Sequence, residues 1–101
     1  MLAVPPGAVV RLRIGPSWPN PAALTVRFTI ETPAGGPLTV RIVDVAGRLV
    51  RELQDGPMTA GTHPFKWSGV DDGGREVRPG LYFVRARAAG AEVSARIVRI
   101  R

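Results

Sequence analysis

The stretch Leu24–Glu31, LTVRFTIE, alternates apolar and polar side chains at every position. Its apolar members share one face of an extended chain: Leu24, Val26, Phe28 and Ile30. Its polar members share the other: Thr25, Arg27, Thr29 and Glu31. A period of two is that of a β-strand with one face in a core and the other in water. The stretch therefore predicts a half-buried strand.

The same alternation recurs on both sides of this stretch. The further candidate strands are Val10–Ile14, Leu38–Ile42, Leu49–Leu53, His63–Trp67, Leu81–Ala88 and Val93–Ile100. Loops are expected at Pro33–Pro37, Gln54–Gly61 and Ser68–Gly80. The 12 glycines and 10 prolines between the apolar runs indicate frequent turns, and nothing has the period of a helix. The 101 residues thus predict an all-β domain, an immunoglobulin-like β-sandwich of seven to eight mainly antiparallel strands.

We expect three parts in this single domain: an N-terminal strand (1–14), a proline-rich crossover (15–23) and the sandwich body (24–101). The predicted core lies between two sheets and consists of Leu24, Val26, Phe28, Ile30, Leu38, Val40, Ile42, Leu53, Phe65, Trp67, Tyr82 and Val84. Pro64 cannot donate to a ladder, so its strand should lie at an edge or a bulge.

Glycines mark two positions where the chain must turn sharply. Asp44–Arg48, DVAGR, predicts a tight turn in which Asp44 bonds the backbone ahead of it and Gly47 takes a positive φ. Gly80 stands where the next strand begins. Both glycines should therefore be structurally demanding.

Composition argues against several classes of function. There is no cysteine, so neither a disulfide framework nor a thiolate metal site can form. No stretch approaches the length of a membrane span. Net charge is +6, which raises nucleic acid as a partner, but the strand arginines alternate singly with apolar residues. A solvated outer face is the better interpretation for Arg11, Arg13, Arg27, Arg41, Arg85, Arg87, Arg96 and Arg99, so no nucleic-acid partner is expected.

Catalytic and metal-binding groups are too few to form a recognisable site. The single histidine, His63, alternates with Phe65 and Trp67 and is interpreted as structural. Asp71 and Asp72 are weak calcium candidates, because calcium needs six or more oxygen ligands. A hairpin turn explains the same residues more simply. We therefore predict no enzyme activity, no cofactor and no metal.

Trp18 lies in the irregular segment Gly15–Pro21, GPSWPNP. Its side chain either packs over one end of the sandwich or contacts a partner, and packing is the favoured interpretation. The prolines of this segment stiffen it and disfavour a tight hairpin back onto the next strand.

From Trp18 onward the order of motifs resembles a known family. The matching pieces are Pro19-Asn20-Pro21 ahead of TVRFTI, then Val40–Leu53, Ala60–Gly69 and Asp71–Arg85, with a last basic and apolar strand. This order is similar to that of the immunoglobulin-like domain of the flagellar hook-capping protein and of the C-terminal sorting domains of type IX secretion cargo proteins. The residues Ala22, Ala23, Ser68 and Arg99 depart from the usual pattern.

The resemblance implies a non-catalytic C-terminal sorting or surface-anchoring module of a secreted or cell-surface bacterial protein. Its partners would be proteins: an attached cargo, the secretion machinery or neighbouring subunits. The residues expected to matter for structure or interaction are Val10, Leu12, Ile14, Trp18, Asn20, Asp44, Gly47, Arg48, Trp67, Gly80 and Tyr82.

Two other functions stay open at this point. A self-assembling subunit of an extracellular filament, or of a hook-cap-like assembly, could use the apolar face of Val10, Leu12 and Ile14 to add a strand to a neighbour. A carbohydrate-binding module has Trp18 and Tyr82 in its favour. The N-terminal strand must be covered, either by its own domain or by another copy, and docking within its own domain is the favoured prediction.

Overall fold

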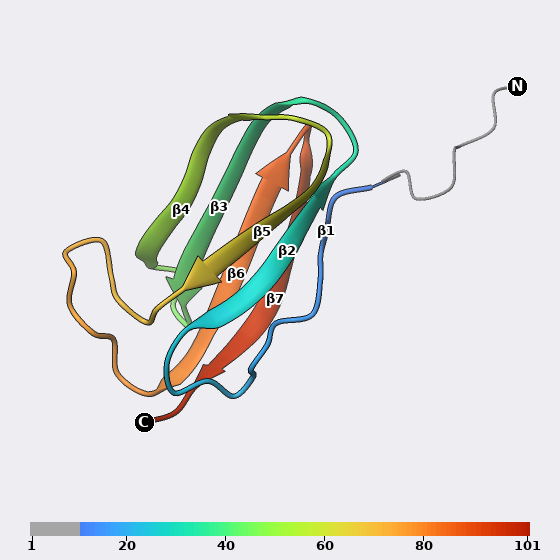
Figure 1. The fold of residues 1–101 in the computed structure, drawn as a ribbon. Coiled ribbons are helices and arrows are strands. Elements are labelled where there is room, and N and C mark those ends of the chain that lie inside the picture. Colours follow the sequence, from blue (N-terminus) through green and yellow to red (C-terminus); the bar gives the residue numbers. More distant parts are fainter. Residues whose placement is uncertain (1–10) are drawn as a thin grey trace, which may run out of the picture.

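The computed structural model describes residues 11–101, which form two packed antiparallel sheets and contain no helix (Figure 1). The strands are β1 (Arg13–Ile14), β2 (Val26–Thr32), β3 (Gly36–Asp44), β4 (Leu49–Met58), β5 (Gly61–Trp67), β6 (Gly80–Ala88) and β7 (Ala91–Arg99). One sheet has the order β1-β2-β5 and the other the order β4-β3-β6-β7. The prediction of an immunoglobulin-like sandwich of seven to eight mainly antiparallel strands is confirmed, with seven strands among residues 11–101. Val10 and the start of the predicted first strand lie outside the described residues.

The core fills the space between the sheets, and β2 shows why. Val26, Phe28 and Ile30 are buried while Arg27 is exposed, as the alternation in the sequence predicts. The other buried apolar residues of the core cluster are Leu12, Ala22, Leu38, Val40, Ile42, Trp67, Tyr82, Val84, Ala86 and Ile97, with Leu53 and Phe65 partly buried against them.

Leu24 is the one predicted core residue that the structure places outside, because its side chain is 79% exposed. The strand β2 begins only at Val26, so Leu24 precedes the alternating part of the chain. Ala22 is fully buried instead. Its backbone N–H donates to Val98 O at 2.9 Å and its carbonyl accepts from Ile100 N–H at 2.9 Å, which fixes this part of the crossover against β7.

The hairpin of β3 and β4 is longer than predicted. Gly36 and Pro37 pair with Met58 and Pro57, so the loop expected at Gln54–Gly61 is largely strand, whereas the loop expected at Pro33–Pro37 is confirmed for residues 33–35 only. The glycines and prolines misled the interpretation because they are tolerated where a backbone N–H has no partner strand. β4 is an edge strand, and β3 pairs with β6 only from Leu38 onward.

Two turns share the pattern Asp-x-x-Gly-Arg and the same hydrogen bonds. Asp44 Oδ1 accepts from the N–H groups of Ala46 and Arg48, each at 2.9 Å, and Gly47 has φ 79° as predicted. Asp71 Oδ1 accepts from Gly73 and Arg75, also at 2.9 Å. A carboxylate that satisfies two N–H groups allows a sharp reversal without a helix. Gly80, at the start of β6, has φ 151°, a backbone conformation that favours glycine.

Residues 11–22 run along the sandwich and change sheets on the way. Arg13 pairs with Glu31 and Ile14 with Ile30, and Gly15 N–H donates to Thr29 O at 2.9 Å. Trp18 and Arg27 exchange two backbone hydrogen bonds of 2.8 Å. The chain therefore does fold back onto β2, but through the long connection of residues 19–26 rather than a tight hairpin. The prolines stand between the donating residues, so their missing N–H groups cost no bond.

The described part of the N-terminal strand is docked on its own domain. Leu12 is buried and belongs to the core cluster, and Ile14 packs against that cluster. The chain then crosses to the other sheet at Asn20–Ala22, where Ala22 forms a parallel bridge with Arg99. In this way one segment covers part of the edge of β2 that faces away from β5, and part of the edge of β7 that faces away from β6.

The remaining sheet edges are interrupted by specific residues. At the edge of β4, Asp72 N–H donates to Val50 O at 2.9 Å and Asp72 Oδ1 accepts from Glu52 N–H at 3.0 Å. At the edge of β5, the backbone of Pro64 points away from β2. Its partner Thr29 directs its own carbonyl to Gly15 N–H on the other side of β2, so Thr29 and Pro64 share no hydrogen bond. A proline at this position removes the donor that an added strand would need. Pro64 thus lies at an edge, as predicted.

Candidate functional site

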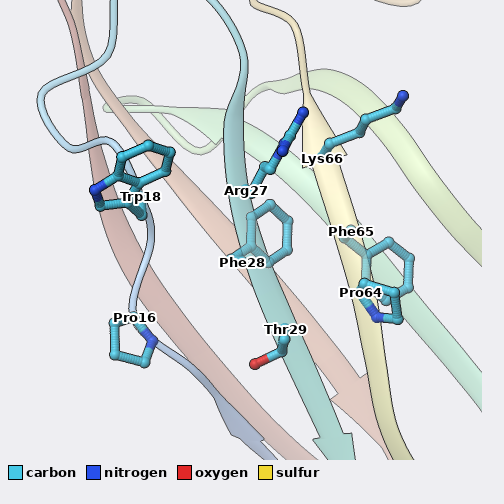
Figure 2. Close-up of a pocket in the computed structure, with 8 residues that line it drawn as sticks. All are labelled: Pro16, Trp18, Arg27, Phe28, Thr29, Pro64, Phe65 and Lys66. Carbon is cyan, nitrogen blue, oxygen red and sulfur yellow. The ribbon is translucent and has the colours of Figure 1, made fainter.

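A groove of about 570 Å³ opens on the outer face of the three-stranded sheet (Figure 2). It is lined by Pro16, Trp18, Arg27, Phe28, Thr29, Pro64, Phe65 and Lys66. Pro16 and Trp18 come from the crossover segment, the next three from β2 and the last three from β5. Figure 2 shows Pro16 and Trp18 on one side of β2, with Pro64 and Lys66 on the other. The groove therefore spans the width of the sheet.

Trp18 forms one wall of this groove, with 72% of its side chain exposed. The favoured prediction that it packs over one end of the sandwich is wrong. Its backbone is held by two hydrogen bonds to the backbone of Arg27, which fix the residue at the edge of β2 that faces away from β5. A large exposed aromatic side chain on a rigidly held backbone is a common feature of binding surfaces.

The charge in the groove is positive and is not neutralised from within the described chain. Arg27 and Lys66 lie directly opposite each other in the β2–β5 register. No carboxylate among residues 11–101 forms an ion pair with either, whereas Arg13 on the same sheet lies 2.7 Å from Glu31. The other sheet also has two opposed arginines, Arg41 and Arg85.

Those two arginines are each paired with a glutamate. Arg41 Nε lies 3.4 Å from Glu52, and Arg85 Nε lies 3.2 Å from Glu92. Like charges placed directly opposite each other destabilise a sheet. The pair in the groove therefore differs from Arg41 and Arg85 in having no carboxylate partner among the described residues.

Polar groups that could orient a ligand are scarce at the bottom of the groove. Phe28 and Phe65 stack with ring centroids 6.0 Å apart, but their rings face the core on the other side of the sheet. Thr29 is the one uncharged polar residue in the lining, and its side chain lies directly over Gly15, where no Cβ would fit. The groove thus combines apolar walls with two cations at one end.

Trp67, Tyr82 and Arg99 form a separate cluster at one end of the core. Trp67 is 2% exposed, its ring meets that of Tyr82 edge-on at 5.3 Å, and its Nε1–H donates to Val70 O at 2.8 Å. The Tyr82 hydroxyl donates to Arg78 O at 2.7 Å. Burial raises the pKa of Tyr82 above its ordinary value, so the hydroxyl keeps the proton that it donates. Tyr82 is therefore a structural residue, and it is not available on a surface for the carbohydrate-binding alternative.

Arg99 contradicts the expectation that the strand arginines all face water, because it is only 8% exposed. Its guanidinium carbon lies 5.4 Å from the centroid of Trp67, and its Nη atoms donate to the carbonyls of Leu24 and Ala23. An aromatic face and backbone carbonyls can hold a buried cation in place of a carboxylate. Gly69 packs so closely on this guanidinium that a Cβ there would collide with it.

Asn20 attaches the crossover to the last strand. Its Nδ2 donates to Arg96 O and its Oδ1 accepts from Val98 N–H, both at 3.0 Å. The amide therefore replaces a neighbouring strand at this part of β7. The resemblance in sequence included Asn20 without indicating this role.

The titratable groups of the described chain do not assemble into a catalytic or metal site. Between residues 11 and 101 no group of three or more His, Asp or Glu side chains could hold a metal ion. Asp71 and Asp72 bond to backbone groups of the turn and of β4. His63 Nε2 lies 2.7 Å from Thr59 O, and its ring is partly buried on β5. No helix in this part of the protein is long and apolar enough to cross a membrane.

Of the residues expected from the sequence to matter for structure or interaction, the groove contains only Trp18. Sequence reasoning missed Pro16, Arg27, Pro64 and Lys66 as a group. Each had a signal of its own, since all four occupy solvent-facing or irregular positions. What the sequence could not show is the register that places Arg27 between Trp18 on one side and Lys66 on the other.

The sheet order, the parallel contact of the crossover with the last strand and the buried Trp67–Tyr82 pair define an immunoglobulin-like domain with a surface groove. The family comparison then narrows this class. A model of the FlgD Ig-like domain matches residues 18–92, and the chain belongs to that family.

A solved structure shares the same fold. The chain is similar to part of dimeric latent PorU from Porphyromonas gingivalis, with a TM-score of 0.63 and 21% sequence identity. The similarity covers 86% of this chain and 9% of that one. No curated protein matches the sequence.

Proposed function

We propose that this domain is a non-catalytic protein-interaction module, and that it serves as a C-terminal sorting or surface-anchoring domain of a secreted bacterial protein. The observation that carries the proposal is membership of the FlgD Ig-like domain family over residues 18–92. The motifs from Trp18 to Arg85 resemble sorting domains of type IX secretion cargo, and the fold similarity to a segment of PorU agrees with that resemblance.

The physical features of the domain support an interaction role. The titratable groups are spent on turns, sheet edges and surface ion pairs, which leaves no constellation for acid–base or nucleophilic chemistry in the described residues. The exposed Trp18 and the unpaired Arg27 and Lys66 instead provide a surface for a partner.

The self-assembling alternative has less support. Its motive was an N-terminal strand that would leave its own domain, yet Leu12, Arg13 and Ile14 are docked against the core and β2 of the same chain. Strand addition would also have to overcome the interruptions at Asp72 and Pro64.

A reporter experiment tests the sorting role. The chain is fused to the C-terminus of a red fluorescent protein that carries an inner-membrane export leader, in a bacterium with a type IX secretion system. We expect the reporter at the cell surface or in the medium, and its accessibility to added protease measures this. The reporter without the domain, and the fusion in a strain that lacks the secretion machinery, should both stay inside the cell envelope. Equal retention of all three, with the fused domain folded, would contradict the sorting role.

A further inference from the structure

We propose that the groove between Trp18 and Lys66 binds an extended peptide segment of a partner protein that carries acidic side chains next to an apolar one. This inference deepens the proposed interaction function and rests on it. It names the chemistry of the partner segment: carboxylates for Arg27 and Lys66, and an aromatic or aliphatic side chain for the space beside Trp18.

The charge of the groove specifies the acidic part. Arg27 and Lys66 face each other across β2 and β5, and no described carboxylate forms an ion pair with either. The opposed arginines Arg41 and Arg85 of the other sheet are each neutralised by a glutamate. A carboxylate placed between Arg27 and Lys66 would convert a repulsive cross-strand pair into an attractive triad.

The walls of the groove specify the apolar part. Pro16, Trp18 and Pro64 present rigid apolar surfaces that lose little conformational entropy when a ligand binds. A side chain inserted between them gains burial against these three walls.

The same walls disfavour a polysaccharide. A sugar buries many hydroxyl groups, and each costs free energy unless it finds a hydrogen-bond partner. The uncharged lining offers one hydroxyl, that of Thr29, which is already packed over Gly15. An apolar peptide side chain makes no such demand.

Recognition must use side chains rather than backbone pairing. An added strand at β5 would need a donor at Pro64, which has none. The outer side of β2 is already occupied by Gly15 and Trp18. The partner segment therefore lies across the face of the sheet, and an extended chain presents every second side chain to that face.

The test is a titration of the full chain, labelled with 15N, with the peptide acetyl-Gly-Phe-Ser-Glu-Ser-Glu-Gly-amide. Its Phe and two Glu side chains share one face when extended. The indole N–H signals of Trp18 and Trp67 report separately, because Trp67 is buried and bonded to Val70 O. We expect the Trp18 signal to shift with saturation and the Trp67 signal to stay in place. Raising NaCl from 50 to 500 mM should weaken binding several-fold.

Variants assign the binding to the groove. Arg27→Gln with Lys66→Gln should weaken binding at least tenfold, and an unmoved Trp67 signal would show that this variant is folded. Arg75→Gln with Arg101→Gln removes the same charge from exposed positions outside the groove and should change binding less than twofold. A peptide with Gln in place of both Glu should bind at least tenfold more weakly.

Three outcomes would overturn the proposal. The Gln peptide could bind as tightly as the Glu peptide, or the Arg75 and Arg101 variant could weaken binding as much as the groove variant. Alternatively, oligogalacturonate could shift the Trp18 signal at lower concentration than the peptide, which would assign the groove to an anionic polysaccharide. Export of the reporter tests the sorting role, whereas the peptide titration tests the groove. Failure of one proposal can therefore be told apart from failure of the other.

Discussion

Trp67 is held from three directions at the end of the core. Tyr82 meets its edge, Arg99 covers its face and Val70 O accepts its indole N–H. These contacts join β5, β6, β7 and the loop after β5 at one point. The Trp67 side chain thus packs against residues of both sheets, and Arg99 connects this cluster to the crossover through the carbonyls of Ala23 and Leu24.

Replacement of this side chain should be costly. Trp67→Ala should lower the free energy of unfolding by about 3–5 kcal/mol, because a large buried aromatic side chain is lost and Arg99 is left without its aromatic face. Urea denaturation followed by circular dichroism measures the change. The matched control is Trp18→Ala, which removes the other tryptophan from an exposed site and should change stability by less than about 0.5 kcal/mol. Equal losses in the two variants would contradict the assigned core.

Asp44 gives a pH-dependent prediction. The hydrogen bond from Arg48 N–H, with that from Ala46 N–H and the guanidinium of Arg48, lowers the pKa of Asp44 below its ordinary value of 3.8. Because the folded-state pKa is the lower one, the stabilisation is present above pH 3.8 and is lost as pH falls through the folded-state value. Wild type should therefore be more stable than Asp44→Asn by a constant amount near neutral pH.

That difference should shrink as the pH falls below 3.8. Urea titrations at a series of pH values from 7 down to 2 measure it. The effect will be small, since the carboxylate is close to solvent. A difference that does not depend on pH would show that the charge of Asp44 has no part in the turn.

At the scale of single residues, the sequence was informative where alternation and turn chemistry agree. Trp67 and Gly47 follow from such patterns. Arg99 was misplaced because an arginine is assumed to face water, although it keeps the inward phase of Val93 and Ile97 on β7. The phase was visible in the sequence. The aromatic face and the two carbonyls that make burial possible come from distant parts of the chain and were not.

At the scale of elements, the segment before β2 acts as a strand that belongs to both sheets. It pairs with β2 through Arg13, Ile14, Gly15 and Trp18, and with β7 through Ala22. The sequence predicted the apolar face of this segment, but three prolines concealed its pairing. The missing information was which N–H groups need partners, and this depends on the register.

Deletion of residues 1–14 tests the docking of this element. We expect a monomer whose free energy of unfolding is lower by about 2 kcal/mol or more, since the buried Leu12 alone accounts for that much. Light scattering gives the mass and thermal denaturation the stability, with Leu12→Ala as the matched point variant. If the shortened chain lost a native oligomer and kept its melting temperature, the strand would belong to a neighbouring copy.

At the scale of the whole molecule, each sheet edge is covered or interrupted in part by a specific residue or segment. Asp72 covers part of β4, residues 20–22 cover part of β7, and Pro64 interrupts β5. The residues that cover or interrupt the edges are far apart in the sequence, and their shared role becomes visible only in the folded sheets. For the same reason the groove could not be predicted, because its lining comes from three separate segments.

Restoring an open edge should change the behaviour of the molecule in solution. Pro64→Val with Lys66→Val returns a donor to β5 and removes its charge, so we expect reversible self-association that increases with concentration. Static light scattering at protein concentrations from about 10 μM to about 1 mM measures this self-association. The control Arg27→Val with Thr29→Val adds apolar side chains to the central strand of the same face and should stay monomeric. Association of both variants alike would assign the effect to surface hydrophobicity rather than to the edge.

The attachment of residues 20–22 to β7 has a mechanical consequence. Figure 1 places the start of β1 and the C-terminus at opposite ends of the sandwich, with the crossover and β7 alongside each other. Four hydrogen bonds, of 2.9–3.0 Å, join Asn20 and Ala22 to the last strand and its end. A pull on the two ends of the chain would load these bonds in shear, all at once, instead of opening them one after another. The rate of forced unfolding is set by the barrier to that first rupture. A domain tied in this way transmits tension between whatever is joined to its two ends while it stays folded.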